Sequence, residues 1–214
     1  MRGFVFVLAL VILTSGCART VTPRVAYGEQ MSVTVTLRDT MALNSNRYFL
    51  VLSSGSGLKV PLPYPDINNN SPEFLEPGMT PQLGTAEAYY SSYFGTWSGY
   101  IELDPGGYFL TKGPFVINQT TTREPLATLG SIKNTINFTF QLERIFGSTI
   151  PDYIYYDFVS VPWPDGQAKI PADHLTSTNA YIAKASGSVT TITDGQDLSI
   201  DGSLDIVNCK VEIE

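Results

Sequence analysis

Aromatic side chains gather in one short stretch, residues 89–100, whose sequence is YYSSYFGTWSGY. Exposed Tyr and Trp rings stack on the apolar faces of sugars while their polar tips hydrogen-bond to hydroxyls, and they also anchor protein interfaces. Trp163 lies between two prolines that favour an extended loop, so it can join the same surface. We therefore predict that Tyr93, Trp97 and Trp163 bind a glycan or a protein partner. The alternative is that such rings fill the core beneath a loop.

Groups suited to catalysis are few. His174 is the single histidine, in the loop-like sequence PADHL, and the chain has no Gly-x-Ser-x-Gly motif, zinc ligand cluster or phosphate-binding glycine loop. A glycosidase needs only two carboxylates on facing elements, and Glu102, Asp157 and Glu143 are candidates for that pair. Their spacing does not show that any two converge. We predict no catalytic residue, with a small carboxylate-dependent glycan hydrolase as the alternative function.

Two acidic segments carry oxygen ligands that suit Ca²⁺. Residues 66–70, DINNN, alternate such ligands as the start of an EF-hand loop does, but Ser71 replaces its Gly and Pro77 replaces its Glu. The second segment has irregular spacing and contains Asp194, Asp197, Asp201 and Asp205. Solvated turns account for both segments more simply. We predict no bound metal and no cofactor.

Composition limits the class of partner. The chain has 214 residues, a formal net charge of −7 and a charged fraction of 15%, against roughly 25% in typical domains. Lys and Arg do not cluster, so the phosphate contacts of a nucleic-acid-binding protein are missing and we expect no nucleic acid partner. The acidic balance also disfavours electrostatic docking on anionic lipid. Polarity comes instead from Ser, Thr, Asn and Tyr.

The hydrophobic pattern has the period of β-strands. Apolar and polar residues alternate over 31–38 and 135–142, and residues 48–52 form a continuous apolar run typical of a central strand buried on both faces. The remaining predicted strands are a hairpin at 100–111, residues 153–161 and 204–213, and short strands near 114–118 and 189–193. The pattern predicts an all-β fold, a single antiparallel two-sheet β-sandwich spanning residues 30–214.

Residues 53–98 interrupt this rhythm with Ser-Gly repeats, several prolines and then the aromatic stretch. A connection of this length exceeds what a sandwich needs and is usually functional. Its Pro and Gly content disfavours a helix there, and only residues 142–146 and 172–175 favour a single helical turn. We predict a long Pro/Gly/aromatic-rich insertion that carries the recognition residues.

The first residues indicate the compartment. Arg2 precedes an apolar run at 4–13, which is shorter than the about 20 residues of a membrane span, and LTSGC follows at 13–17. This segment resembles the lipobox signal of bacterial lipoproteins. The resemblance implies a signal peptide at 1–16, cleavage before Cys17, and a diacylglyceryl group on the Cys17 thiol, so that several acyl chains such as palmitate on this one residue anchor the chain to the membrane.

A lipid on Cys17 has further implications. Residues 17–29 become the lipidated cysteine and a short tether, which places the domain at the extracytoplasmic face of a bacterial membrane. Ala18 is not the Asp that retains lipoproteins in the inner membrane, so the resemblance implies the outer membrane in a Gram-negative cell. Cys209 is then unpaired, and we predict that it is a small buried residue on the strand face shared with Val207, Val211 and Ile213.

The strand order and the closing sequence LDIVNCKVEI, residues 204–213, also resemble, at the level of fold, β-sandwiches of the DOMON and carbohydrate-binding-module type. That resemblance brings no signature residues and carries over no site. Together these features predict a lipid-anchored lipoprotein of the bacterial cell envelope that acts as a non-catalytic binding or structural module. Its expected partners are the membrane, through Cys17, and an envelope protein or glycan.

Overall fold

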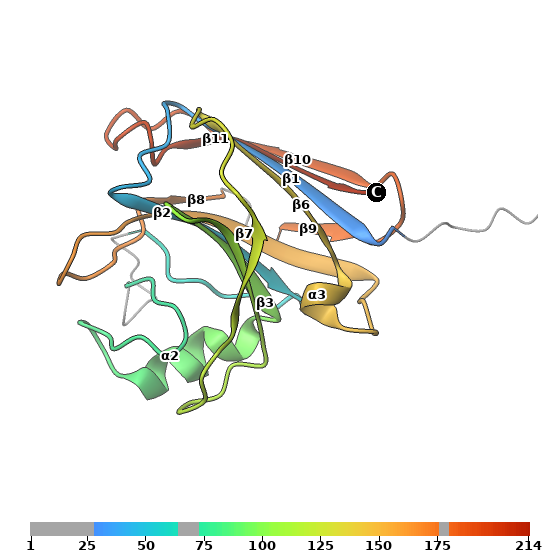
Figure 1. Cartoon of the computed structure of the whole chain (residues 1–214), viewed down its shortest axis with the longest axis horizontal. Helices are drawn as coiled ribbons and strands as arrows, with labels where there is room; N and C mark the ends of the chain where they lie inside the picture. Colours follow the sequence, from blue (N-terminus) through green and yellow to red (C-terminus); the bar gives the residue numbers. More distant parts are fainter. Residues whose placement is uncertain (1–27, 64–72, 176–179) are drawn as a thin grey trace, which may run out of the picture.

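Two antiparallel sheets pack face to face in this protein (Figure 1). The computed structural model describes residues 28–63, 73–175 and 180–214. Strands contain 40% of these residues and helices 8%, so the predicted all-β sandwich is confirmed. The predicted signal peptide, Cys17 and most of the tether lie outside the described residues. Within the described ranges, no helix is long and apolar enough to cross a membrane.

The smaller sheet has the strand order β10-β11-β1-β6. Its strands are β1 (Gln30–Leu37), β6 (Thr135–Gln141), β10 (Val189–Thr193) and β11 (Ile206–Ile213). Alternate residues of β1 are buried, as the period-two pattern predicts. A register shift between Thr36 and Leu37 buries Ile206 and leaves Val207 half-buried. The predicted inward face of the last strand is therefore wrong for Val207 and right from Cys209 onward.

The larger sheet has the order β5-β4-β3-β2-β7-β8, and β9 pairs with the first half of β7. Its strands are β2 (Asn46–Ser53), β3 (Gly99–Asp104), β4 (Gly107–Lys112), β5 (Arg123–Ala127), β7 (Tyr153–Pro162), β8 (Asp173–His174) and β9 (Ala180–Ala183). The predicted hairpin is β3–β4, and β2 is central, between β3 and β7. Residues 114–118 form a loop rather than the predicted strand, and 172–175 contain β8 rather than a helical turn.

The main core lies between the two sheets. Inward side chains of both sheets meet there, and Tyr48, Tyr156 and Phe158 are among the largest that are fully buried. The hydroxyl of Tyr48 donates to the carbonyl of Ser203 at 2.6 Å, so its polar end is satisfied. Cys209 is fully buried in the same core, which confirms the interpretation of this thiol as a small apolar residue. Each such large side chain contributes about 1.5–3 kcal/mol through burial.

A second core covers the opposite face of the larger sheet. Phe49 and Val51 of β2 and Val159 and Val161 of β7 point away from the main core, yet they are buried. The 53–98 insertion covers them with Val60, Phe74, Leu75, Tyr89, Tyr93, Phe94 and Trp97. Figure 1 shows this segment and its helix lying beneath the larger sheet, on the side away from β1 and β11.

The insertion contains a helix, contrary to the prediction. Helix α2 (Ala86–Ser92) is followed by the 3₁₀ turn η1 (Phe94–Thr96). The hydroxyl of Thr85 caps α2 by accepting the Ala88 N–H at 3.3 Å. No Pro or Gly lies between Gly84 and Gly95, so the chain from 85 onward can form the helix. The predicted single turn near 142–146 is confirmed as α3 (Glu143–Phe146).

Candidate functional site: an uncharged groove beside the insertion

Two of the three predicted binding residues are buried. Trp97 is 4% exposed and Tyr93 6% exposed, both in the second core. The Trp97 indole N–H donates to the carbonyl of Lys59 at 2.7 Å, and its ring stacks on Phe74 with centroids 5.7 Å apart. The structure therefore places Tyr93 and Trp97 in the core that the alternative interpretation foresaw, and neither ring offers a face to a ligand.

Trp163 lies elsewhere, at the rim of the second core. Its ring is half-buried and contacts Phe49, with centroids 5.6 Å apart. The guanidinium carbon of Arg47 lies 6.0 Å from the Trp163 ring centroid, and the ammonium of Lys169 lies 5.4 Å from it. Two cations thus already face this ring. The three predicted residues do not form one surface.

Helix periodicity explains which ring of the aromatic stretch stays accessible. Tyr89 and Tyr93 are four residues apart, so they share the inward side of α2 and are buried. Tyr90 is offset by about 100° along the helix and remains half-exposed. Its ring meets the buried ring of Phe94 edge-on, with centroids 5.0 Å apart, and this contact holds it in place. Tyr90 is the surface ring that the sequence analysis missed.

A groove of about 560 Å³ opens beside Tyr90. Its walls are the loop at 77–81, the outward side of α2 and the loop at 117–121. The lining side chains are Pro77, Met79, Thr80, Pro81, Ala86, Tyr90, Ile117, Asn118, Gln119, Thr120 and Thr121, together with Gly78. Among the described residues, none that lines this groove is charged. The groove thus combines one ring and several small apolar groups with neutral hydroxyls and amides.

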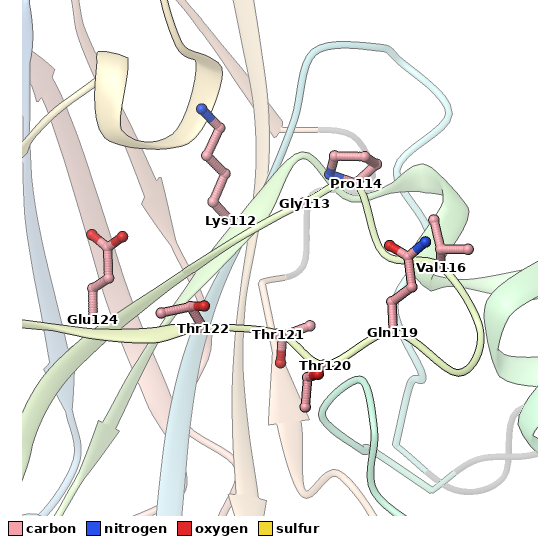
Figure 2. A pocket seen from close by; sticks show the side chains of 9 residues that line it. All are labelled: Lys112, Gly113, Pro114, Val116, Gln119, Thr120, Thr121, Thr122 and Glu124. Carbon is pink, nitrogen blue, oxygen red and sulfur yellow. The ribbon is translucent and has the colours of Figure 1, made fainter.

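A second, smaller pocket of about 210 Å³ is lined in part by the same loop (Figure 2). Figure 2 shows the end of β4 at Lys112, the loop with Val116 and Gln119, and the returning segment with Thr122. Gln119, Thr120 and Thr121 line both pockets. The two pockets thus share this loop, and the smaller one has two charged lining side chains, Lys112 and Glu124.

A buried carboxylate holds one wall of the groove in position. Glu73 is 1% exposed, and its oxygen Oε2 accepts the backbone N–H groups of Gln82 and Leu83 at 2.9 and 3.0 Å. Its other oxygen accepts the Lys169 N–H at 3.3 Å. Backbone donors satisfy this acid, so the 73–83 segment is fixed against the loop after β7. Loop geometry of this kind has no sequence pattern that would identify Glu73 in advance.

Glu102 is a buried acid of the candidate catalytic set. It lies on β3, facing the second core, and is 4% exposed. Burial, together with a hydrogen bond to the side chain of Glu76, raises the pKa of Glu102 to about 9. Arg123 opposes this rise, with Nη2 at 2.6 Å from Glu102 Oε2 and 2.5 Å from Asp104 Oδ2. The raised pKa favours the protonated form of Glu102 at neutral pH, and Arg123 joins β5 to β3.

Asp157 forms a separate buried pair with His174. Oδ2 of Asp157 lies 3.5 Å from Nδ1 of His174, and its other oxygen accepts the Leu175 N–H at 3.3 Å. Burial raises the pKa of Asp157 although His174 acts against it. Burial lowers the pKa of His174, but the carboxylate of Asp157 together with the charges of Asp173 and Asp194 outweighs this, and the net shift is upward. This pair ties β8 to β7.

The three candidate carboxylates are not brought together. Strand β2 separates Glu102, which pairs with Phe49, from Asp157, which pairs with Val51, so their backbones are about 12 Å apart across the sheet. Glu143 is exposed on α3. None of the three lines the groove. Over the described ranges, no group of three or more His, Cys, Asp or Glu side chains can hold a metal ion. Residues 66–70 of the first acidic segment lie outside those ranges.

Comparison of the chain with protein-family models, with curated proteins and with solved structures found no match. The chemistry of the groove and of the buried acid pairs is therefore the basis for proposing a function.

Proposed function

We propose that this protein is a lipid-anchored envelope lipoprotein whose β-sandwich is a non-catalytic binding module, and that the groove beside Tyr90 binds a glycan. The observation that supports the ligand class is the lining of the groove. A chain with a net charge of −7 presents there a Tyr ring, small apolar groups and neutral hydroxyls and amides, with no charged lining residue in the described ranges.

This chemistry matches that of an uncharged sugar. A pyranose ring has an apolar face that stacks on an aromatic ring and a rim of hydroxyls that need donors and acceptors. Tyr90 supplies the ring, while Asn118, Gln119 and the threonines at 120–121 supply both kinds of hydrogen-bonding group. A phosphorylated or strongly acidic ligand would meet no cation in the groove itself. The proposed ligand is therefore a neutral glycan.

The anchor is tested by metabolic labelling. The lipobox-like sequence supports acylation of Cys17, so palmitate should label the wild-type chain and should not label Cys17→Ala. Label that persists in this variant would contradict the anchor. A matched Cys209→Ala variant should keep the label, because Cys209 is buried in the main core.

The binding module is tested with the detergent-solubilised full chain on an array of neutral glycans. For a glycan that binds, Tyr90→Ala should weaken affinity about tenfold, which corresponds to about 1.4 kcal/mol. Tyr153→Ala is the matched control, because that ring is 52% exposed and lies outside the groove. Equal binding by Tyr90→Ala and the wild type would refute the site.

The same glycans also test the hydrolase alternative. The buried Glu102 and Asp157 lie in separate pairs outside the groove, which supports binding without turnover. We therefore expect bound glycans to be recovered intact. Products that form with the wild type and are lost in Glu102→Gln or Asp157→Asn would instead favour the carboxylate-dependent hydrolase.

A further inference from the structure

Three tyrosines form a surface cluster at one end of the larger sheet. Tyr153 and Tyr155 lie on β7, and Tyr181 lies opposite them on β9. The ring centroids of Tyr153 and Tyr181 are 5.8 Å apart and those of Tyr155 and Tyr181 are 5.7 Å apart. Tyr153 is 52% exposed and Tyr181 54% exposed. This tyrosine cluster therefore presents ring faces and phenol groups to its surroundings.

Val189 lies near the tyrosine cluster along the chain fold, but on the outer face of the smaller sheet, where it pairs with Glu212. It begins β10 and is 51% exposed, and the neighbouring Thr190 hydroxyl donates to the Tyr181 carbonyl at 3.3 Å. The other exposed large apolar side chains of the described ranges are Leu83, Val116, Ile132 and Leu198. They occur singly, in separate loops. Exposed rings that contact one another, as those of the tyrosine cluster do, mark an interaction site, whereas scattered residues need no explanation.

The chain leaves the domain beside this cluster. The Gly28 N–H donates to the carbonyl of Lys184, one residue after β9, at 2.9 Å. The N–H of Glu29 donates to the Glu214 carbonyl at 3.0 Å. A side chain at Gly28 would collide with the Ile213 side chain, 2.1 Å from the ideal Cβ position, so the backbone is tightly seated here. Figure 1 shows β9, the start of β1 and the C-terminus at the same end of the sandwich.

The number of residues between Cys17 and Gly28 limits how far the tyrosine cluster can lie from the membrane. From Cys17 to Gly28 a fully extended chain reaches at most about 40 Å. A lipid on Cys17 would thus keep the tyrosine cluster within a short distance of the bilayer surface. Tethering of this kind raises the effective concentration of two surfaces to the millimolar range, so a contact too weak to hold alone becomes populated.

We propose that the tyrosine cluster rests in the headgroup region of the phospholipid bilayer and orients the lipid-anchored domain, with position 189 as a reporter at the same end of the sandwich. This inference rests on the proposed anchor at Cys17. Tyr side chains favour the membrane interface because the ring is apolar and the phenol group remains hydrated. The exposed Asp152 beside the cluster pairs with Lys184 at 3.4 Å. Rings rather than cations therefore make the contact, and it needs no anionic lipid.

A fluorescent label at position 189 tests this orientation. The full chain is made in a lipidating bacterial host as Val189→Cys, labelled with a fluorescent maleimide, and reconstituted in phosphatidylcholine vesicles that carry acyl-chain nitroxides. Cys17 is blocked by its lipid, and burial raises the pKa of Cys209 to about 12, which keeps that thiol unreactive. The matched control is Leu198→Cys, which is 79% exposed and lies in the loop near Arg38, at the other end of β1.

The proposal expects strong quenching at position 189, little at 198, and a loss of the difference when Tyr153→Ser and Tyr181→Ser are added. Both tyrosines are exposed, so these changes should leave the far-UV spectrum and the unfolding midpoint nearly unchanged. Intact mass first establishes that the chain carries its lipid. In such a chain, equal quenching at both positions overturns the inference, and so does quenching at 189 that survives the serine changes. A chain without lipid overturns the anchor itself, and this inference with it.

Discussion

Replacing Trp97 with alanine tests the second core directly. The side chain is 4% exposed, and its ring lies against Phe74, Phe94, Tyr100 and Phe115 at centroid distances of 5.1–6.3 Å. Truncation of a buried Trp to Ala costs about 3–5 kcal/mol through lost burial and the cavity left behind. Against a typical unfolding free energy of about 5–15 kcal/mol, a loss of about 4 kcal/mol is large.

The measurement is urea unfolding of wild type, Trp97→Ala and Trp97→Phe, followed by far-UV circular dichroism and by the fluorescence of Trp163, which remains in every variant. Trp97→Phe keeps one six-membered ring in the core and loses the rest of the indole with its hydrogen bond to Lys59, so its cost should be smaller, below about 3 kcal/mol. Hydrogen exchange should show the lost protection first in the insertion. If Trp97→Ala unfolds within about 1 kcal/mol of wild type, the ring is not part of a core and the interface interpretation returns.

Three further predictions concern single residues. The pKa of Glu102 is raised to about 9 from an ordinary 4.5, so its contribution to stability is complete below pH 4.5 and is lost as pH rises to about 9. Glu102→Gln should flatten this decline when the free energy of unfolding is measured against pH. An unchanged slope of that free energy with pH would contradict the prediction. A Cβ at Gly99 would lie 2.7 Å from Ile145 and 2.8 Å from a backbone oxygen, so Gly99→Ala should lower the free energy of unfolding by about 1–3 kcal/mol. The control is Gly55→Ala, whose Cβ would meet open space; it should change that free energy by under about 0.5 kcal/mol. Cys209 should react with thiol reagents only at the rate of unfolding, and fast labelling of the native chain would disprove its burial.

The sandwich was predictable because its strands carry local patterns. Strand β1 alternates over its whole length, and the pairing of Val33 with Val211 and Phe138 follows from that alternation. The strands that escaped prediction lack such a pattern. In β5 the sequence REPLA contains a proline and remains largely exposed at the sheet edge, and β8 has two residues held by pairing with β7. Tertiary contacts, rather than local propensity, define these elements.

The candidate site was predictable only in part. The sequence indicated where the rings are concentrated but not which of them face solvent, because that depends on the unforeseen helix α2. Once α2 forms, Tyr89 and Tyr93 share its buried side and Tyr90 turns outward. The groove itself joins loops at 77–81 and 117–121, which no sequence pattern connects. Its uncharged lining becomes visible only after folding brings these loops together.

The second core explains why an aromatic-rich insertion is a poor guide to binding residues in this fold. An antiparallel sheet usually has one solvated face, yet residues 48–52 form a continuous apolar run. Such a run requires a cover on both faces, and only Tyr48, Leu50 and Leu52 face the other sheet. The outward Phe49 and Val51 need the rings of the insertion above them. Most of those rings are therefore buried in the second core. The residues left to bind a ligand are those on the outer side of the insertion, where Tyr90 borders the groove.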